Sequence, residues 1–224
     1  MTYYFGFALA EDHQSQLDAL LDKHARGEYS DAAEISRLAI MGVDGVVHAL
    51  AINVIALLRD ENGDGTALLD KVAKLVLKTM NGLLGQLLAS VSQEEQDKLA
   101  EYMLRRRVQL PEKRLFGYLL SDADGQRFQQ ELSAVAEQKQ INRDELAKLL
   151  MHFIDLTTVS CYDEFIDCLT LSFIKRQGAS LARTTIIKAG HATIRSLIKS
   201  LNDEQVIAVA CYYRGMFHQV VTDM

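Results

Sequence analysis

The sequence contains a single proline, and few of its stretches alternate apolar and polar residues in the manner of a half-buried strand. One proline leaves almost the whole chain free to form helices, and the scarcity of alternation gives no support for a sheet. Leu, Ala, Gln, Glu and Lys, which all favour helix, are abundant. We therefore expect an all-α fold without a sheet.

Cysteine is also scarce: the chain has Cys161, Cys168 and Cys211, all in its second half. An odd number of cysteines does not make a disulfide framework and is typical of reduced thiols in a cytoplasm. Neither a CxxC pair nor a zinc-finger spacing occurs. We expect Cys161 and Cys168, which share a helix face, to fill core volume.

Motifs of the common enzyme classes are missing, since the chain has no P-loop, GxGxxG, HExxH or GxSxG sequence. The N-terminal residues lack the basic opening and long apolar core of a signal peptide. The most apolar run, Val46–Leu58, is interrupted by His48 and Asn53 and is shorter than the ~20 residues that cross a bilayer, so we expect no membrane span. These absences favour a cytoplasmic protein, bacterial in style, without catalytic activity.

The charge is moderately acidic, with a formal net charge of −6 and an isoelectric point near 5.5. This balance disfavours a general affinity for nucleic-acid phosphates. The basic stretch Arg105–Arg114 contains Pro111, and we expect it to be a linker whose cations are solvated and complement the end of the preceding helix.

What the chain does have is an internal repeat. The segment Lys78–Tyr102 returns as Lys188–Tyr212, so that a shift of 110 residues aligns lysine with lysine and tyrosine with tyrosine at the two ends. The matched positions between them are mostly helix-spaced apolar residues or turn residues, which a duplicated fold must keep.

The repeat extends upstream at a shift of 111 residues. Phe5-Gly6-Phe7 is echoed by Phe116-Gly117-Tyr118, and the capping box Asp31–Glu34 is echoed by Asn142–Glu145. The sequence therefore predicts a tandem duplication of a helical unit of about 110 residues. Residues 1–110 and 111–224 would be two copies related by a pseudo-twofold axis, packed as one domain or as two.

About four helices are expected in each copy. In the first copy they cover residues 11–26, 31–59, 66–90 and 93–106. In the second they cover 122–138, 143–176 with a break near Thr157–Ser160, 180–200 and 203–221. The second helix of the first copy is apolar nearly all round in its later half, which predicts a central position in the bundle. Its residues expected to be buried are Val46, Val47, Leu50, Val54 and Leu57.

Polar residues embedded in the second helix of each copy are candidate metal ligands. Asp44 and His48 stand at i, i+4, and His152 and Asp155 stand at i, i+3, so each pair shares a helix face. If the two helices packed together, the pairs would form a carboxylate and imidazole cluster for a divalent metal. The competing interpretation is that each pair satisfies its own hydrogen bonds.

The segment Asp60–Gly65 matches the first half of an EF-hand calcium loop, with Asp, Asn, Asp and Gly at positions 1, 3, 5 and 6. Position 12, where that loop needs a bidentate Glu, is Lys71. We therefore expect a polar turn, matched in the second copy by the turn at Lys175–Gly178.

Tyr102 and Tyr212 are the matched aromatic residues near the copy ends. Each would either anchor its helix to its own core, or line the junction between the copies, where a ligand would meet both hydroxyls.

These patterns favour a non-enzymatic binding or regulatory protein whose partner occupies a groove between the two copies. The partner would be another protein or a small ligand, no cofactor is predicted, and a homodimer is compatible with the sequence. The alternative is a metal-binding or metal-dependent protein that uses the Asp and His residues of the central helices.

Overall fold

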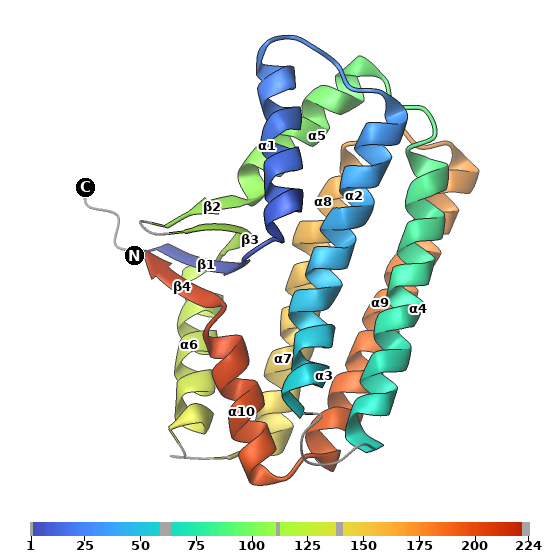
Figure 1. The fold of residues 1–224 in the computed structure, drawn as a ribbon. Coiled ribbons are helices and arrows are strands. Elements are labelled where there is room, and N and C mark those ends of the chain that lie inside the picture. The colour runs from blue at the N-terminus through green and yellow to red at the C-terminus, as the bar shows by residue number, and fades with distance from the viewer. Residues whose placement is uncertain (1, 59–63, 111–112, 138–140, 221–224) are drawn as a thin grey trace.

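The computed structural model describes residues 2–58, 64–110, 113–137 and 141–220, and it is mostly helical with a small sheet (Figure 1). The first half of the chain contains the elements β1 (Thr2–Phe7), α1 (Glu11–Ala25), α2 (Ala32–Val47), η1 (His48–Ile52), α3 (Asn53–Leu58), α4 (Asp64–Leu87), α5 (Gln93–Arg106) and β2 (Arg107–Gln109). The second half contains β3 (Arg114–Leu120), α6 (Asp122–Ala136), α7 (Arg143–Thr157), η2 (Thr158–Asp163), α8 (Glu164–Asp167), α9 (Phe173–Ser200), α10 (Asp203–Arg214) and β4 (Phe217–Val220). The segments η1 and η2 are π-helical.

The four strands form an antiparallel sheet in the order β2-β3-β1-β4, so the expectation of a fold without a sheet was wrong. At the centre of the sheet Gly6 pairs with Gly117. A Cβ atom on Gly117 would lie 1.8 Å from the carbonyl oxygen of Phe5, so only glycine fits there. Apolar and polar residues do not alternate along β3, because apolar residues are buried on both of its faces.

The stretch Arg105–Arg114, expected to join the two copies, has regular structure at both its ends. It spans the last turn of α5, the strand β2 and the start of β3, which pair as neighbouring antiparallel strands. Four of its cations form ion pairs: Arg107 and Arg114 with Asp18, at 2.9 and 2.8 Å, and Arg105 and Arg106 with Glu164. Pro111 lies outside the described residues.

The long helices α2, α4, α7 and α9 stand side by side, and the sheet lies on their flank (Figure 1). The pair α1 and α5 covers one side of the sheet, and the pair α6 and α10 lies on the other side. The core behind the sheet is aromatic: the ring centroids of Phe5 and Phe153 are 4.7 Å apart, and those of Phe128 and Phe217 are 4.6 Å apart. Such contacts fix the sheet against α6 and α7.

Helix starts follow the predicted caps. Asp31 and Asn142 each accept a hydrogen bond from the backbone N–H of the Glu three residues later, and Ser92 forms a full capping box with Glu95. Asn202 forms a second full box with Gln205. The helices predicted over residues 11–26 and 93–106 are therefore confirmed to within a residue at each end.

The predicted helix boundaries of the second half were wrong in two places. The helix from Arg143 ends at Asp167 rather than 176, and α9 begins at Phe173, where Ser172 is the N-cap. Lys175–Gly178 therefore lies inside a helix and is not a turn. The last helix ends at Arg214 rather than 221, because Phe217–Val220 pairs with β1.

The predicted central helix runs through α2, η1 and α3, and its burial is mixed. Val47 and Val54 are buried, Val46 and Leu50 are half-buried, and Leu57 is 44% exposed, so its predicted burial was wrong. Residues Ala32–Leu58 are long and apolar enough to cross a membrane by length and composition, which is weak evidence because core helices pass the same test.

Candidate functional site

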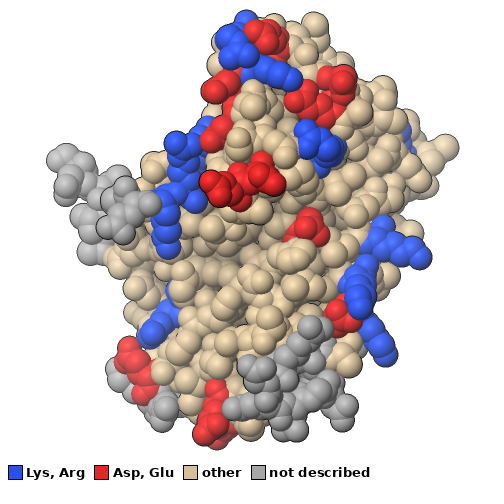
Figure 2. All heavy atoms as spheres, in the orientation of Figure 1, with Lys and Arg blue, Asp and Glu red and all other residues tan. Residues whose placement is uncertain are grey.

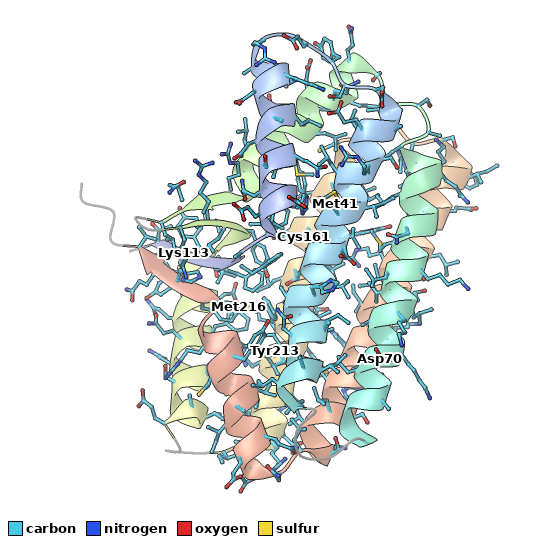
Figure 3. All side chains as sticks on the ribbon, in the orientation of Figure 1. Met41, Asp70, Lys113, Cys161, Tyr213 and Met216 are labelled. Carbon is cyan, nitrogen blue, oxygen red and sulfur yellow. The ribbon has the colours of Figure 1, made fainter. Side chains whose placement is uncertain are left out.

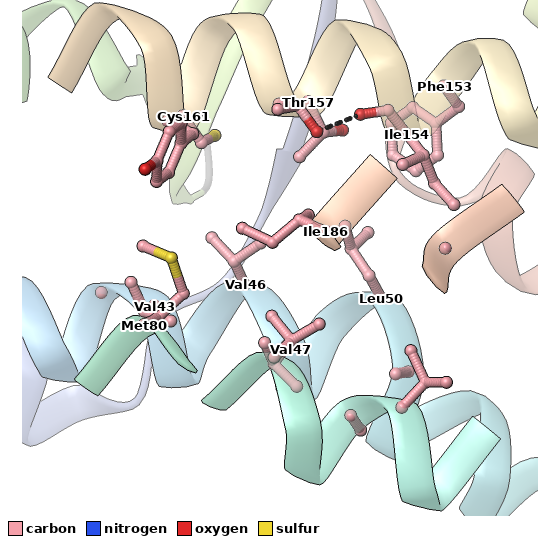
Figure 4. A pocket seen from close by; sticks show the side chains of 18 of the residues that line it. Val43, Val46, Val47, Leu50, Met80, Phe153, Ile154, Thr157, Cys161 and Ile186 are labelled. Carbon is pink, nitrogen blue, oxygen red and sulfur yellow. Dashed lines mark hydrogen bonds between the residues drawn. The ribbon is translucent and has the colours of Figure 1, made fainter. Parts of the chain in front are cut away.

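An apolar cavity of about 200 Å³ lies between the long helices (Figure 4). Its walls come from both halves of the chain: α2, η1, α4 and α5 on one side, and α7, η2 and α9 on the other. Side chains facing it include Val43, Val46, Leu50, Met80, Ile154 and Ile186. Residues at several lining positions are too small to fill the space, namely Ala39, Gly42, Ala51 and Ala73. Small side chains on α2, η1 and α4 therefore leave part of this space unfilled.

The polar groups at the cavity wall are already paired. Thr158 donates a 2.8 Å hydrogen bond to the carbonyl oxygen of Ile154, and the Thr157 and Tyr118 hydroxyls are 2.8 Å apart. Tyr162 and Tyr213 donate to the carbonyl oxygens of Ala179 and Leu50, both at 2.7 Å. With these hydroxyls occupied, the wall offers a ligand little except apolar contact.

Apolar contact in this cavity would contribute considerable stabilisation free energy. Cavities in protein cores reduce stability by about 24 cal/mol per Å³, so filling 200 Å³ with apolar atoms would contribute roughly 5 kcal/mol. The net stability of a domain is about 5–15 kcal/mol. Occupation of this cavity would therefore have a measurable effect on unfolding.

Tyr102 and Tyr212 both bond to the backbone of the opposite half of the chain. Tyr102 donates a 3.0 Å hydrogen bond to the carbonyl oxygen of Cys161 in η2, and Tyr212 donates a 2.7 Å bond to that of Ala49 in η1. Each tyrosine thus bonds to a π-helical segment of the other half, where the ordinary helical hydrogen-bond pattern is interrupted. Tyr102 lines the apolar cavity and Tyr212 lines a separate cleft, so the two hydroxyls do not meet. Their role in binding stays a prediction.

A buried cation lies behind the α5 end of the cavity. Arg106 is 4% exposed, forms an ion pair with Glu164, and its guanidinium stands 5.0 Å from the centre of the Tyr102 ring. Its Nε has no hydrogen-bond partner among the described residues. Nearby, burial raises the pKa of the Cys161 thiol to about 12, so this thiol is not a ready nucleophile.

The four predicted metal ligands are not brought together. His48 Nδ1 lies 3.3 Å from Asp44 Oδ2, whereas His152 Nε2 pairs with Asp124 Oδ1 at 2.8 Å. Asp155 instead pairs with His191 Nε2, also at 2.8 Å. Sequence reasoning missed Asp124 and His191 because neither lies within a helix turn of its partner.

In the part of the chain that the structure describes, no group of three or more His, Cys, Asp or Glu residues could hold a metal ion. Most of the EF-hand-like segment, Asp60–Gly63, lies outside the described residues, and α4 begins at Asp64. The described residues therefore do not fit a metal centre, and the metal hypothesis stays a prediction.

The surface charges form no large basic patch on the face seen in Figure 2. Lys and Arg are interspersed with Asp and Glu toward the two ends and the flanks, and a broad uncharged band lies between them. Searches of protein-family models, curated proteins and solved structures found no match to this chain.

Proposed function

We propose that this chain is a non-enzymatic binding protein whose ligand is a small apolar molecule held in the cavity between its two halves. The observation that carries the proposal is the cavity of about 200 Å³, lined by apolar side chains from both halves. We infer that this cavity is the partner-binding groove that the sequence suggested between the two copies. Ligand sites in proteins are typically concave and mostly apolar, with few polar groups.

The volume limits the ligand. It corresponds to roughly seven groups of about 30 Å³ each, the volume of one water molecule in the liquid. An alkylbenzene or a short alkyl chain is of this order. The paired hydroxyls at the wall disfavour a ligand that needs several hydrogen bonds, because nothing would compensate its desolvation.

A tandem duplication is part of the proposal and explains why the cavity lies where it does. Both halves run from a strand through helices and a π-helical segment to a second strand, and the pairing of Gly6 with Gly117 joins their first strands. The bonds of Tyr102 and Tyr212 both reach the π-helical segment of the opposite half, although their acceptors, Cys161 and Ala49, are not matched positions of the repeat. Superposition of residues 2–109 on 113–220 tests it: Phe5 should fall on Phe116, and Ser92 on Asn202. Unrelated helix directions would end this part of the proposal.

Thermal unfolding in the presence of neutral alkylbenzenes tests the binding function. Benzene, ethylbenzene and butylbenzene should raise the melting temperature, because a ligand that binds only the folded state stabilises it by mass action. The rise should grow with alkyl length until the ligand no longer fits the cavity.

A cavity-filling variant provides the decisive comparison. Val46→Phe would place a ring in the cavity and should abolish the ligand-induced rise while leaving the chain folded. Leu57→Phe is the matched control, since Leu57 lies on the same continuous helix but is 44% exposed and outside the cavity. A rise of equal size in both variants would place binding elsewhere and reject the proposal.

The metal-binding alternative has no geometric support among the described residues, yet it is simply tested. If the chain binds an apolar ligand and no metal, elemental analysis of protein purified without added metal should find no stoichiometric metal. A near-stoichiometric transition metal would favour the alternative. A cytoplasmic location and a homodimer stay proposals, to be tested by cell fractionation and by light scattering.

A further inference from the structure

A second cavity, separate from the apolar one, is a cleft of about 720 Å³ on the sheet side of α2. Its walls are β1 and the following residues, the start of α1, the face of α2 and η1 that turns toward the sheet, and the junction of α10 with β4. In Figure 3, Lys113 and Met216 lie on the sheet side and Met41 lies on α2. Unlike the apolar cavity, this cleft is lined by histidine, aspartate and lysine side chains.

His13 is the most informative of these side chains. It is 5% exposed and lines the cleft, yet it makes no hydrogen bond to any residue that the structure describes. Cε1 of its ring would lie 3.8 Å from a Cβ atom at Gly42, so the imidazole stands close to the face of α2. An imidazole at a cleft wall that makes no hydrogen bond within the protein is free to bond to a molecule in the cleft.

The start of α1 faces the same cleft. This helix is 15 residues long, and its N-cap residue, Ala10, has no side chain able to cap the first backbone N–H groups. Ala8 and Ala10 both line the cleft. The N–H donors of an uncapped helix N-terminus suit an oxyanion, although Glu11 and Asp12 in the first turn of α1 offset part of its positive charge.

The remaining polar wall adds donors. Lys113 is exposed at the rim, and His218 lies on β4 with its Nε2 3.3 Å from the carbonyl oxygen of Gly6. The one carboxylate among the described lining residues is Asp44, whose Oδ2 is 3.3 Å from His48 Nδ1. Asp44 also acts to raise the pKa of His13, which favours the protonated imidazole as a donor, although burial lowers that pKa more.

We propose that this cleft binds a small oxyanion, a carboxylate or a phosphate group, between the His13 imidazole, the N-terminus of α1 and the Lys113 ammonium. The imidazole donates a hydrogen bond to one oxygen, and the open backbone N–H groups at the start of α1 donate to another. The lysine contributes charge at the rim. The site is independent of the apolar cavity, because the two share no lining residue.

Titration of the protein with inorganic phosphate and, separately, with succinate tests the site, with the His13 ring signals followed by NMR in a buffer without either anion. One of the anions should shift these signals with a saturable dissociation constant in the millimolar range or below. The anion that binds more tightly identifies the chemistry as phosphate or carboxylate. No saturable shift with either anion would overturn the proposal.

Variants separate the site from general charge effects, with binding followed calorimetrically. His13→Gln should weaken binding about tenfold or more, and Lys113→Ala several-fold, because each removes a charge-assisted or buried hydrogen bond. His24→Gln and Arg114→Ala are the controls: His24 lies on the same helix and Arg114 beside Lys113, but neither lines the cleft. Since Lys113 is exposed, its variant reports on binding even if His13→Gln is unstable. Equal affinity in all four variants would overturn the assignment.

Discussion

The hydroxyl of Tyr212 donates a 2.7 Å hydrogen bond to the carbonyl oxygen of Ala49, a residue 163 positions earlier in the chain. In the other direction, Tyr102 donates to the carbonyl oxygen of Cys161. Both acceptors belong to π-helical segments, so each half of the chain supplies a donor that the other half needs. The two halves are therefore joined by side-chain-to-backbone hydrogen bonds as well as by their apolar surfaces.

Replacing either tyrosine by phenylalanine should destabilise the protein by about 1–2 kcal/mol, because a buried carbonyl oxygen loses its partner. Tyr102→Ala should destabilise it by about 3–5 kcal/mol, since the ring of Tyr102 is buried. Urea unfolding followed by circular dichroism measures both. Tyr4→Phe, whose hydroxyl has no partner among the described residues, should change little, and an equal loss there would count against the role of the two bonds.

Leu50→Asp should unfold the protein or destabilise it by several kcal/mol, since it places a carboxylate without a partner at the wall of the apolar cavity. The same substitution at Leu57, three residues after Val54 and 44% exposed, should have a much smaller effect. Melting temperatures of the two variants make the comparison. Similar losses would show that Leu57 is as buried as the sequence suggested.

The thiols should differ in reactivity. Burial raises the pKa of Cys161 to about 12 and also raises that of Cys168, whereas Cys211 is exposed. Iodoacetamide at pH 8 should therefore label Cys211 first, with Cys161 protected in the folded state, as peptide mass spectrometry would detect. Early labelling of Cys161 would contradict the enclosed position at the cavity wall.

Stability should fall as the pH falls below about 6.5. Burial lowers the pKa of both His13 and His218 below the ordinary value of 6.5, although Asp44 opposes the effect at His13 and the Gly6 carbonyl opposes it at His218. Between the lowered and ordinary values the unfolded chain binds protons that the folded chain does not, so the free energy of unfolding rises with pH there.

Urea midpoints at pH 7.5 and 5.5, in buffers without phosphate, measure this dependence for the wild type and for His13→Gln/His218→Gln. The wild type should lose stability toward acid by up to about 1.4 kcal/mol per pH unit for each histidine, and the double variant should lose less. Identical pH profiles would show that neither histidine resists protonation in the folded state.

Local sequence rules predicted the features that local physics determines. The cap residues Asp31, Ser92 and Asn142 each begin a helix, because a short polar side chain and the backbone three residues later suffice to satisfy one another. The helical class and the burial of Val47 and Val54 followed from composition and periodicity in the same way.

The sheet, the cavity and the cleft depend on contacts between distant residues, which one sequence does not show. Strands β1 and β3 pair across more than a hundred residues, and their apolar faces gave no alternation. The Tyr212 bond to Ala49 and the pairing of His152 with Asp124 are likewise long-range. The Phe5-Gly6-Phe7 echo was the one sequence feature pointing to the sheet, and its interpretation as a repeat did not reveal that the two segments pair.

The most direct test of the central claim is a nuclear Overhauser experiment with butylbenzene bound to protein carrying labelled methyl groups. If butylbenzene occupies the apolar cavity, it should show contacts to the methyl groups that face this cavity, those of Val46, Leu50, Ile154 and Ile186. Contacts confined to exposed apolar residues such as Ile174 and Leu181, 80% and 69% exposed, would contradict it.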